Sequence, residues 1–283
     1  MKVFIKVLKI LGLITLIFVT IIYCLFYWAT SPKSDKKVKD TFTELHVEAT
    51  LTNETFRSFN YRKATIIKDT ISPTLVFVHG TIGSLLDFSS YMTDSLLLSK
   101  ANMISYDRVG YNYEDKNDVQ ESIAFERDLL ENLVKNINPK KVILVGYSYG
   151  GPIALASNKK FKKVILFAPA VYSKVEPMPW MVNLYKWKLT RWLVPPIWKQ
   201  ASKEKISHRQ DLIKFENNWK ENPNLITSIH GNSDWIVPYA NSEFLKSQFP
   251  QNQFELVTIQ DAGHGLVWTE FKKIKQELLK HLN

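Results

Sequence analysis

Ser148 is the residue whose surroundings most clearly indicate chemistry. It lies at the centre of residues 146–150, Gly-Tyr-Ser-Tyr-Gly, after the apolar run 141–145 and before the small residues of 151–156. This order predicts a buried strand, a sharp turn and a helix, which together hold a serine hydroxyl on an exposed corner. The free N–H groups and positive end of that helix would face any negative charge that develops beside the serine. The pattern therefore predicts that Ser148 is a nucleophile.

A nucleophilic serine needs a base, and two residues further along the chain complete the set. A serine hydroxyl reacts poorly until a neighbouring group accepts its proton, and histidine, which titrates near neutrality, can accept and return it. Asp234 follows the predicted strand 225–230, and His264 follows the predicted strand 254–259. Because the carboxyl ends of parallel strands meet at one edge of a sheet, these side chains can converge on Ser148. We expect His264 to be the base and Asp234 to orient its imidazole.

Two other carboxylates compete with Asp234. Asp261 lies only three residues before His264, where it could brace the histidine loop or cap the following helix. Asp234 is favoured over Asp261 as the triad carboxylate because Asp234 lies just past the end of a predicted strand. Asp107 is interpreted as a structural partner of Arg108 or of nearby backbone N–H groups.

Only one of the histidines lies in a glycine-flanked loop after the last predicted strand, and it is His264. We interpret His79 as a structural residue that shapes its loop, His230 as a core or strand-end residue, and His208 as a solvated residue of a charged helix. The six histidines are His46, His79, His208, His230, His264 and His281.

Two further motifs, each a predicted strand followed by a short polar loop, precede Ser148 in the chain. The predicted strand 74–78 leads into 79–84, His-Gly-Thr-Ile-Gly-Ser, and the predicted strand 102–106 leads into 107–111, Asp-Arg-Val-Gly-Tyr. Together with the order Ser…Asp…His, these motifs resemble those of the α/β-hydrolase superfamily. The resemblance covers about residues 74–283, apart from a variable insert.

The resemblance implies both a fold and a set of roles. In that superfamily the loop after the first of these strands supplies half of an oxyanion hole. The backbone N–H groups of Thr81 and of Tyr149, the residue after the nucleophile, would therefore hold the oxyanion. Ser148, Asp234 and His264 would form the catalytic triad. No cofactor is implied.

Strands that alternate with helices predict an α/β fold with a mainly parallel central sheet covered by helices on both faces. Residues 42–50 and parts of 56–67 are expected to be the opening antiparallel strands, and 163–168 another strand. The predicted helices are 84–98, 119–137, 149–158, 238–248 and 266–281.

The alternation is interrupted at about residues 171–224, where hydrolases of this kind often carry a helical lid. Prolines divide this insert into short helices. One interpretation is that its aromatic side chains pack the lid onto the core, and this should hold for most of them. The other is that they roof an apolar pocket for an acyl chain or touch a bilayer. The insert holds five of the eight tryptophans: Trp180, Trp187, Trp192, Trp198 and Trp219.

The N-terminus predicts a membrane anchor. Residues 10–29 form a stretch of 20 residues without charge, and a helix of that length is about 30 Å long, enough to span a bilayer. Tyr23, Tyr27 and Trp28 at its far end suit the membrane interface. A cleaved signal peptide is the alternative, but signal h-regions are usually about 7–15 residues long. We therefore expect residues 1–30 to remain as a signal-anchor.

Residues 31–41 are expected to be a basic linker, followed by the hydrolase domain at 42–283. Lysines stand on both sides of the span, so the positive-inside comparison nearly balances. A basic N-terminal start favours an extracytoplasmic catalytic domain. Cys24 is the single cysteine, which excludes an intrachain disulfide.

Composition narrows the function classes. The net charge is +10, but the basic residues form no clustered motif that would indicate nucleic-acid binding. The sequence also contains no spacing of residues typical of a metal-binding motif. We expect a membrane-anchored serine hydrolase, esterase- or lipase-like, that cleaves a hydrophobic ester through an acyl-enzyme. An amidase or peptidase, a thioesterase or a haloperoxidase-type relative would carry the same triad. From another class, a non-catalytic hydrolase-fold binding module is the alternative.

Overall fold

A computed structural model describes residues 1–113 and 117–282 and contains a single eight-stranded sheet with the order β1-β2-β4-β3-β5-β6-β7-β8. All pairs from β4 to β8 are parallel, which confirms the predicted mainly parallel α/β architecture. Each parallel strand lies within two residues of its predicted bounds. These strands are β3 (Thr74–Val78), β4 (Asn102–Tyr106), β5 (Val142–Tyr147), β6 (Lys163–Phe167), β7 (Ile226–Gly231) and β8 (Phe254–Ile259).

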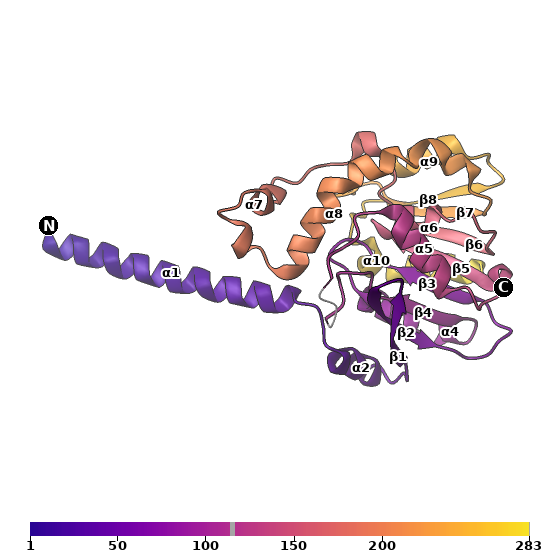
Figure 1. Ribbon diagram of the computed structural model, residues 1–283, viewed down its shortest axis with the longest axis horizontal. Helices are drawn as coiled ribbons and strands as arrows, with labels where there is room; N and C mark the ends of the chain where they lie inside the picture. Colours follow the sequence, from indigo (N-terminus) through magenta and orange to yellow (C-terminus); the bar gives the residue numbers. More distant parts are fainter. Residues whose placement is uncertain (114–116, 283) are drawn as a thin grey trace.

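Two hydrophobic cores lie on the two faces of this sheet, and helices cover both (Figure 1). Neighbouring strand residues alternate between them, so that Val76 belongs to one core and Leu75 to the other. One core is covered by α5 (Ile123–Leu133), α6 (Gly150–Leu155) and α9 (Ala240–Gln248). The other is covered by η1 (Leu85–Phe88), α3 (Ser89–Met92), α4 (Ser95–Leu98), α10 (Leu266–Thr269) and α11 (Phe271–Lys280).

The predicted helices are present but shorter or divided. The expected helix 84–98 is three short pieces, because the side chain of Asp94 accepts hydrogen bonds from the N–H groups of Leu96 and Leu97 and starts a new helix. The expected helix 149–158 ends at Leu155.

The start of the domain differs most from the expectation. Residues 35–44 form α2 (Asp35–Glu44) where a linker and the first strand were predicted. Val38 and Phe42, four residues apart on one face, are buried in the core, and the Ser34 hydroxyl accepts from Lys37 N–H at the N-terminus. The antiparallel hairpin is instead β1 (Thr50–Phe56) and β2 (Phe59–Ile66), so the predicted strand at 42–50 is wrong.

The insert between β6 and β7 is helical and divided, as its prolines indicate. The interpretation that most of its tryptophans pack on the core is wrong: Trp219 is buried, but Trp180, Trp187 and Trp192 are exposed. Its elements are η3 (Ser173–Val175), α7 (Val182–Lys186), η4 (Arg191–Leu193), α8 (Pro196–Ile213) and η5 (Glu216–Glu221).

The N-terminal α1 (Lys2–Thr30) projects from the domain as a single long helix with no buried residue (Figure 1). Within the described residues it is the one helix long and apolar enough to cross a membrane, a property that signal sequences share. Its C-terminal end contacts the insert, where the rings of Phe26 and Trp198 lie 5.6 Å apart.

Candidate functional site

Ser148 occupies the turn between β5 and α6. Its φ of +54° lies in the left-handed region, and its backbone N–H donates to the carbonyl of Phe167 on the neighbouring strand at 2.9 Å. Such a conformation is costly for a residue with a Cβ and needs support from its surroundings. The flanking glycines are required, because a Cβ on Gly146 would overlap the Gly150 carbonyl and one on Gly150 would overlap the Val78 carbonyl.

The structure brings the three predicted residues into one chain of contacts. His264 Nε2 lies 3.0 Å from Ser148 Oγ. On the other side of the ring, His264 Nδ1 lies 2.7 Å from Asp234 Oδ2. Both distances are those of hydrogen bonds. When Nδ1 carries the ring proton and donates it in a hydrogen bond to the carboxylate, Nε2 is free to accept the serine proton.

Asp234 is held in its ionised form. Burial by itself would raise its pKa, but hydrogen bonds from His230 and His264, the charge of His264 and the N–H of Val237 lower the pKa well below its usual value. Asp234 Oδ1 accepts from the N–H groups of Ile236 and Val237 at 2.9 and 2.8 Å. Because both oxygens are fixed, the carboxylate can fix the tautomer and orientation of the imidazole.

Two residues that support Asp234 and His264 were not assigned these roles from the sequence. His230, on β7, lies 3.3 Å from Asp234 Oδ2 through its Nε2. Tyr147 stacks on the His264 ring at 5.1 Å, and its hydroxyl donates to the His264 carbonyl at 2.9 Å. The only signal for Tyr147 was its place next to Ser148, which predicts no contact with a loop 117 residues away.

The loop after β3 lies against the serine. A Cβ on Gly80 would meet Ser148 Cβ at 2.8 Å, so only glycine allows this approach. Thr81 follows directly in this loop, and Tyr149 is the N-cap residue of α6. The two residues predicted to supply oxyanion N–H groups therefore belong to the segments on either side of Ser148.

His79 shapes this loop, as interpreted from the sequence. Its Nε2 accepts from the N–H of Arg108 at 3.0 Å, and its Nδ1 lies 2.7 Å from the Gly80 carbonyl. Burial, together with the charge of Arg108, lowers the pKa of His79 well below its usual value. It is therefore a neutral ring whose two nitrogens are both engaged.

A buried ionic cluster connects the same loop to the insert. Arg108 donates to the Gly80 carbonyl at 3.1 Å and to Glu204 Oε1 at 2.6 Å. Glu204, on α8, also accepts from Tyr111 Oη at 2.6 Å and from Thr81 Oγ1 at 3.1 Å. Glu204 thus ties the insert to the loop beside the nucleophile. Nothing in the polar sequence around Glu204 distinguishes it from its solvated neighbours.

The remaining candidates lie elsewhere. Asp261 is exposed, and its backbone N–H donates to Asn232. Asp107 accepts from Leu85 N–H and pairs with Arg62, so its predicted N–H contact is present but its partner is not Arg108.

The prediction that His208 is solvated is wrong. His208 is buried, and its Nε2 lies 3.0 Å from the Ala170 carbonyl. The face of α8 that carries it packs on the domain, with the His208 and Tyr149 rings 4.6 Å apart.

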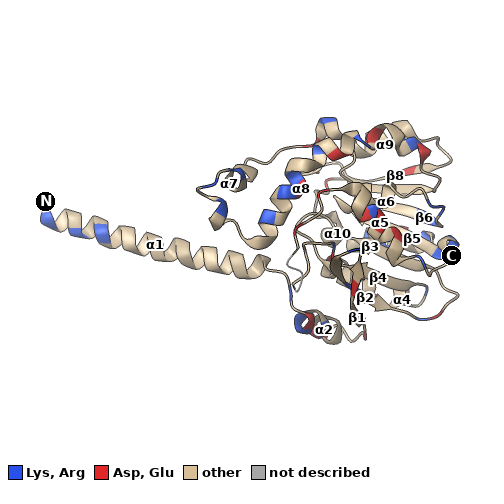
Figure 2. Cartoon of the chain, viewed as in Figure 1, with Lys and Arg blue, Asp and Glu red and all other residues tan. Residues whose placement is uncertain are grey.

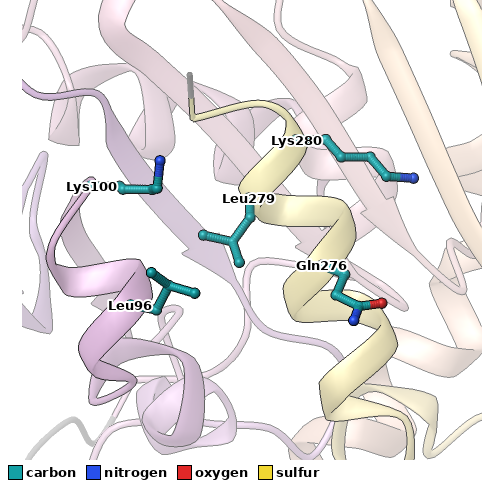
Figure 3. Close-up of a pocket in the computed structure, with 5 residues that line it drawn as sticks. All are labelled: Leu96, Lys100, Gln276, Leu279 and Lys280. Atoms are coloured by element: carbon teal, nitrogen blue, oxygen red, sulfur yellow. The ribbon is translucent and has the colours of Figure 1, made fainter.

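Other features of the surface do not compete with this site. A groove of about 340 Å³ between α4 and α11 contains none of the predicted site residues (Figure 3). Its lining residues are Leu96, Lys100, Gln276, Leu279 and Lys280. In the described part of the chain, no three His, Cys, Asp or Glu side chains are grouped to hold a metal ion.

Known proteins share this architecture. A family model described as the α/β hydrolase fold matches residues 73–209. An esterase from Exiguobacterium antarcticum is 17% identical, covering 83% of this chain and 99% of its own, with a TM-score of 0.66. A bromoperoxidase from Bacillus anthracis is 17% identical, covering 83% of this chain and 99% of its own, with a TM-score of 0.63. A membrane phospholipase A, described as a bacterial virulence factor, is 14% identical with a TM-score of 0.62, covering 100% of this chain and 98% of its own. At these identities the likeness establishes a shared fold.

Proposed function

The chain is an α/β-hydrolase-fold protein, and from that premise we propose that it is a serine hydrolase that cleaves carboxylic esters through an acyl-enzyme. The observation that carries the proposal is the continuous contact from Ser148 Oγ through His264 to Asp234, at 3.0 and 2.7 Å. A protein that only binds a ligand has no need of this arrangement.

In the first half of the proposed reaction, Ser148 Oγ attacks the ester carbonyl carbon while His264 Nε2 accepts the hydroxyl proton. The C–O bond to the alcohol then breaks, and His264 returns the proton to the departing alkoxide. Asp234 stays ionised throughout and stabilises the imidazolium. In the second half, His264 accepts a proton from water as the water oxygen attacks the acyl carbon. The bond from that carbon to Ser148 Oγ then breaks, and His264 returns the proton to Oγ, which releases the acid and restores Ser148.

The negative oxygen formed at each attack needs donors. The N–H groups of Thr81 and Tyr149 are proposed for this role, since their segments flank Ser148 and Gly80 approaches it closely. Each donor of this kind contributes about 3–4 kcal/mol to transition-state stabilisation.

A hydrophobic ester is the proposed substrate, and a membrane is the proposed location. The insert is rich in exposed apolar side chains, and α1 is long and apolar enough to span a bilayer as a retained anchor. The similarity to an esterase and to a membrane phospholipase A supports both proposals. The extracytoplasmic placement of the catalytic domain, from its basic N-terminal start, remains a prediction.

Labelling with a fluorophosphonate probe tests the nucleophile. The full chain in detergent should be labelled, and Ser148→Ala and His264→Ala should lose the label. Ser95→Ala and His46→Asn, at exposed positions, are the matched controls and should label like wild type. Labelling that persists in Ser148→Ala would refute the mechanism.

The leaving group is tested separately. Turnover of a p-nitrophenyl ester series is expected to exceed that of the corresponding anilide and thioester. The bromoperoxidase likeness gives one rival activity a specific basis, so peracid-dependent bromination is measured beside ester hydrolysis. A folded protein that labels with no probe and turns over none of these substrates would favour the binding-module alternative.

A further inference from the structure

The part of the insert that precedes α8 presents an unusual surface. Residues 178–193, here called the tryptophan segment, include Trp180, Trp187 and Trp192, which are 72%, 59% and 72% exposed. Exposed apolar side chains gathered in this way mark a surface that contacts a partner or a membrane. The large apolar residues exposed in the segment are Met178, Trp180, Met181, Leu184, Trp187, Leu189, Trp192 and Leu193.

The polar groups of this segment are largely satisfied from within it. The Thr190 hydroxyl donates to the Leu184 carbonyl at 2.7 Å, and Arg191 Nε donates to the Tyr185 carbonyl at 2.7 Å. The indole N–H of Trp192 donates to the Leu189 carbonyl at 3.0 Å. Backbone carbonyls that already have partners can enter a poorly hydrated region at low cost.

The charge of the insert complements one kind of partner. Between Glu176 and Glu204 the chain has five basic residues and no acidic one. Figure 2 shows basic residues at α7 and along α8. Cations next to exposed indoles are the pattern of a surface that lies among anionic lipid headgroups. The five are Lys186, Lys188, Arg191, Lys199 and Lys203.

The position of the segment points to the same partner. The segment, with α7 at its centre, and α1 project from the same side of the domain, towards the N-terminal end of α1 (Figure 1). The Phe26–Trp198 contact fixes the start of α8 against the end of α1, beside the interfacial residues Tyr27 and Trp28. A bilayer that holds α1 therefore reaches the tryptophan segment as well.

We propose that the tryptophan segment docks into the interface of the leaflet that receives the C-terminal end of α1. The three indoles and the aliphatic side chains enter the headgroup region and the outer acyl chains, and the exposed Lys186 and Lys188 contact lipid phosphates. Lys203 already pairs with Asp118 and is not part of this contact. The segment is thus a second membrane contact, independent of the span itself.

This contact also defines the substrate class, and that part rests on the proposed function. α10 begins directly after the His264 loop and lies on the side of the domain that faces α1 and α7 (Figure 1). The edge of the sheet that carries Ser148 therefore faces the docked leaflet. The substrate is the acyl ester of a lipid that enters from this leaflet.

Fluorescence quenching in vesicles tests the docking without any need for activity. The full chain carrying Cys24→Ser and Trp187→Cys, labelled with an NBD fluorophore, is reconstituted in phosphatidylcholine–phosphatidylglycerol vesicles. Doxyl-labelled phosphatidylcholine in the bilayer should quench the label, and aqueous iodide should not. Ile71→Cys in the same background is the control, because Ile71 is 78% exposed in the loop before β3. It should show the opposite response.

Two results would overturn the docking. Quenching by iodide alone at position 187 would place the segment in water. Protection from both quenchers would mean that protein covers it, most simply a second copy of this chain. Circular dichroism of both labelled proteins checks that each is folded.

Hydrolysis tests the substrate class. The combined variant Trp180→Ser, Trp187→Ser and Trp192→Ser should hydrolyse soluble p-nitrophenyl butyrate like wild type but lose hydrolysis of a diacyl phospholipid in vesicles. Ile71→Ser should retain both activities. Equal retention of both by the triple variant would refute the proposed entry from the leaflet. Absence of both activities in wild type would instead count against the proposed function, while the quenching still decides the docking.

Discussion

The turn that carries Ser148 and the tryptophan segment are opposites in construction. Around Ser148, neighbouring backbone fills the space on several sides, so that Gly80, Gly146 and Gly150 leave no room for a Cβ. The tryptophan segment is held mainly by hydrogen bonds among its own residues and exposes its large side chains. Close packing of buried backbone fixes the conformation of the Ser148 turn, whereas the distinguishing property of the tryptophan segment is its exposed apolar surface. Reactive groups need fixed distances, whereas a surface that meets lipid needs only its composition and its place.

Glu204 lies on α8, the helix that follows the tryptophan segment, and links the insert to the loop beside Ser148. It lies on the insert, yet its carboxylate is buried against Arg108 and Thr81 of the catalytic side. Substitutions at Glu204, and at residues packed around Ser148 and Arg108, can therefore test this comparison.

The largest effect is expected from Asp234→Asn. The amide cannot hold His264 in the tautomer that accepts the serine proton, so kcat should fall by about 10⁴-fold. Steady-state hydrolysis of a soluble ester measures it. Asp261→Asn, at the rival exposed carboxylate, should leave kcat unchanged, and a large loss there would reverse the assignment of the two residues.

Glu204→Gln is expected to have the next largest effect. It removes the nearer of the two carboxylates that pair with the buried Arg108 and leaves only Glu126, at 3.8 Å, which should cost about 3–5 kcal/mol of unfolding free energy. The amide nitrogen would be a donor where Glu204 now only accepts, beside Arg108 and Thr81. The loop next to Ser148 should therefore shift, and kcat should fall more than KM rises. Denaturant unfolding and ester kinetics measure the two effects. Glu221→Gln, exposed in the same insert, is the control. A similar loss of stability and activity there would mean that the buried Arg108–Glu204 pair contributes no more than an exposed glutamate.

Gly150→Ala should destabilise the protein by about 1–3 kcal/mol, the usual range for overpacking. Its Cβ would meet the carbonyls of Val78 and His79 and push the loop after β3 away from Ser148. Thermal unfolding and fluorophosphonate labelling report on the two consequences. Gly263→Ala is the matched control, since a Cβ there meets only the Ser233 carbonyl, at 3.9 Å. Tolerance of both substitutions would contradict the description of the Ser148 turn as backbone-limited.

The smallest effect is expected from Glu126→Gln, and it depends on pH. Burial, only partly offset by Arg108, raises the pKa of Glu126 from 4.5 to about 8. Because the folded pKa is the higher one, wild type loses stability as pH rises between these two values. The glutamine removes this loss, so the variant should exceed wild type by about 1–2 kcal/mol above pH 8 and match it near pH 5. Denaturant unfolding at the two pH values measures this, and a difference that does not change with pH would disprove the shift.

The parallel strands could be predicted because burial on both faces makes them continuous apolar runs. The segment Leu75–Val78, for example, has no polar residue and contributes to both cores. The helix α2 was missed for the opposite reason. Only Val38 and Phe42 are apolar and buried in a run of lysines and other polar residues, so composition indicated a linker.

The three residues that meet at Ser148 could also be predicted, because each follows a strand of one parallel sheet. Their supports could not. Tyr147 and Glu204 act on groups more than 90 residues away in sequence, and a polar residue on a polar helix carries no mark of such a contact. His208 was misjudged for the same reason, since the face of α8 that packs inward includes polar side chains.

Arg62 is buried beside the first residues after α1 and binds the carbonyl of Lys33 and the carboxylate of Asp35, while its other side pairs with Asp107. The domain is therefore joined to α1 by a short connection that Arg62 holds in place. If α1 spans a bilayer as proposed, this connection would keep the domain close to the membrane and keep the edge of the sheet that carries Ser148 turned towards the lipids. Its encounters with substrate would be set by lateral diffusion within one plane, so turnover should follow the surface density of substrate and not its bulk concentration.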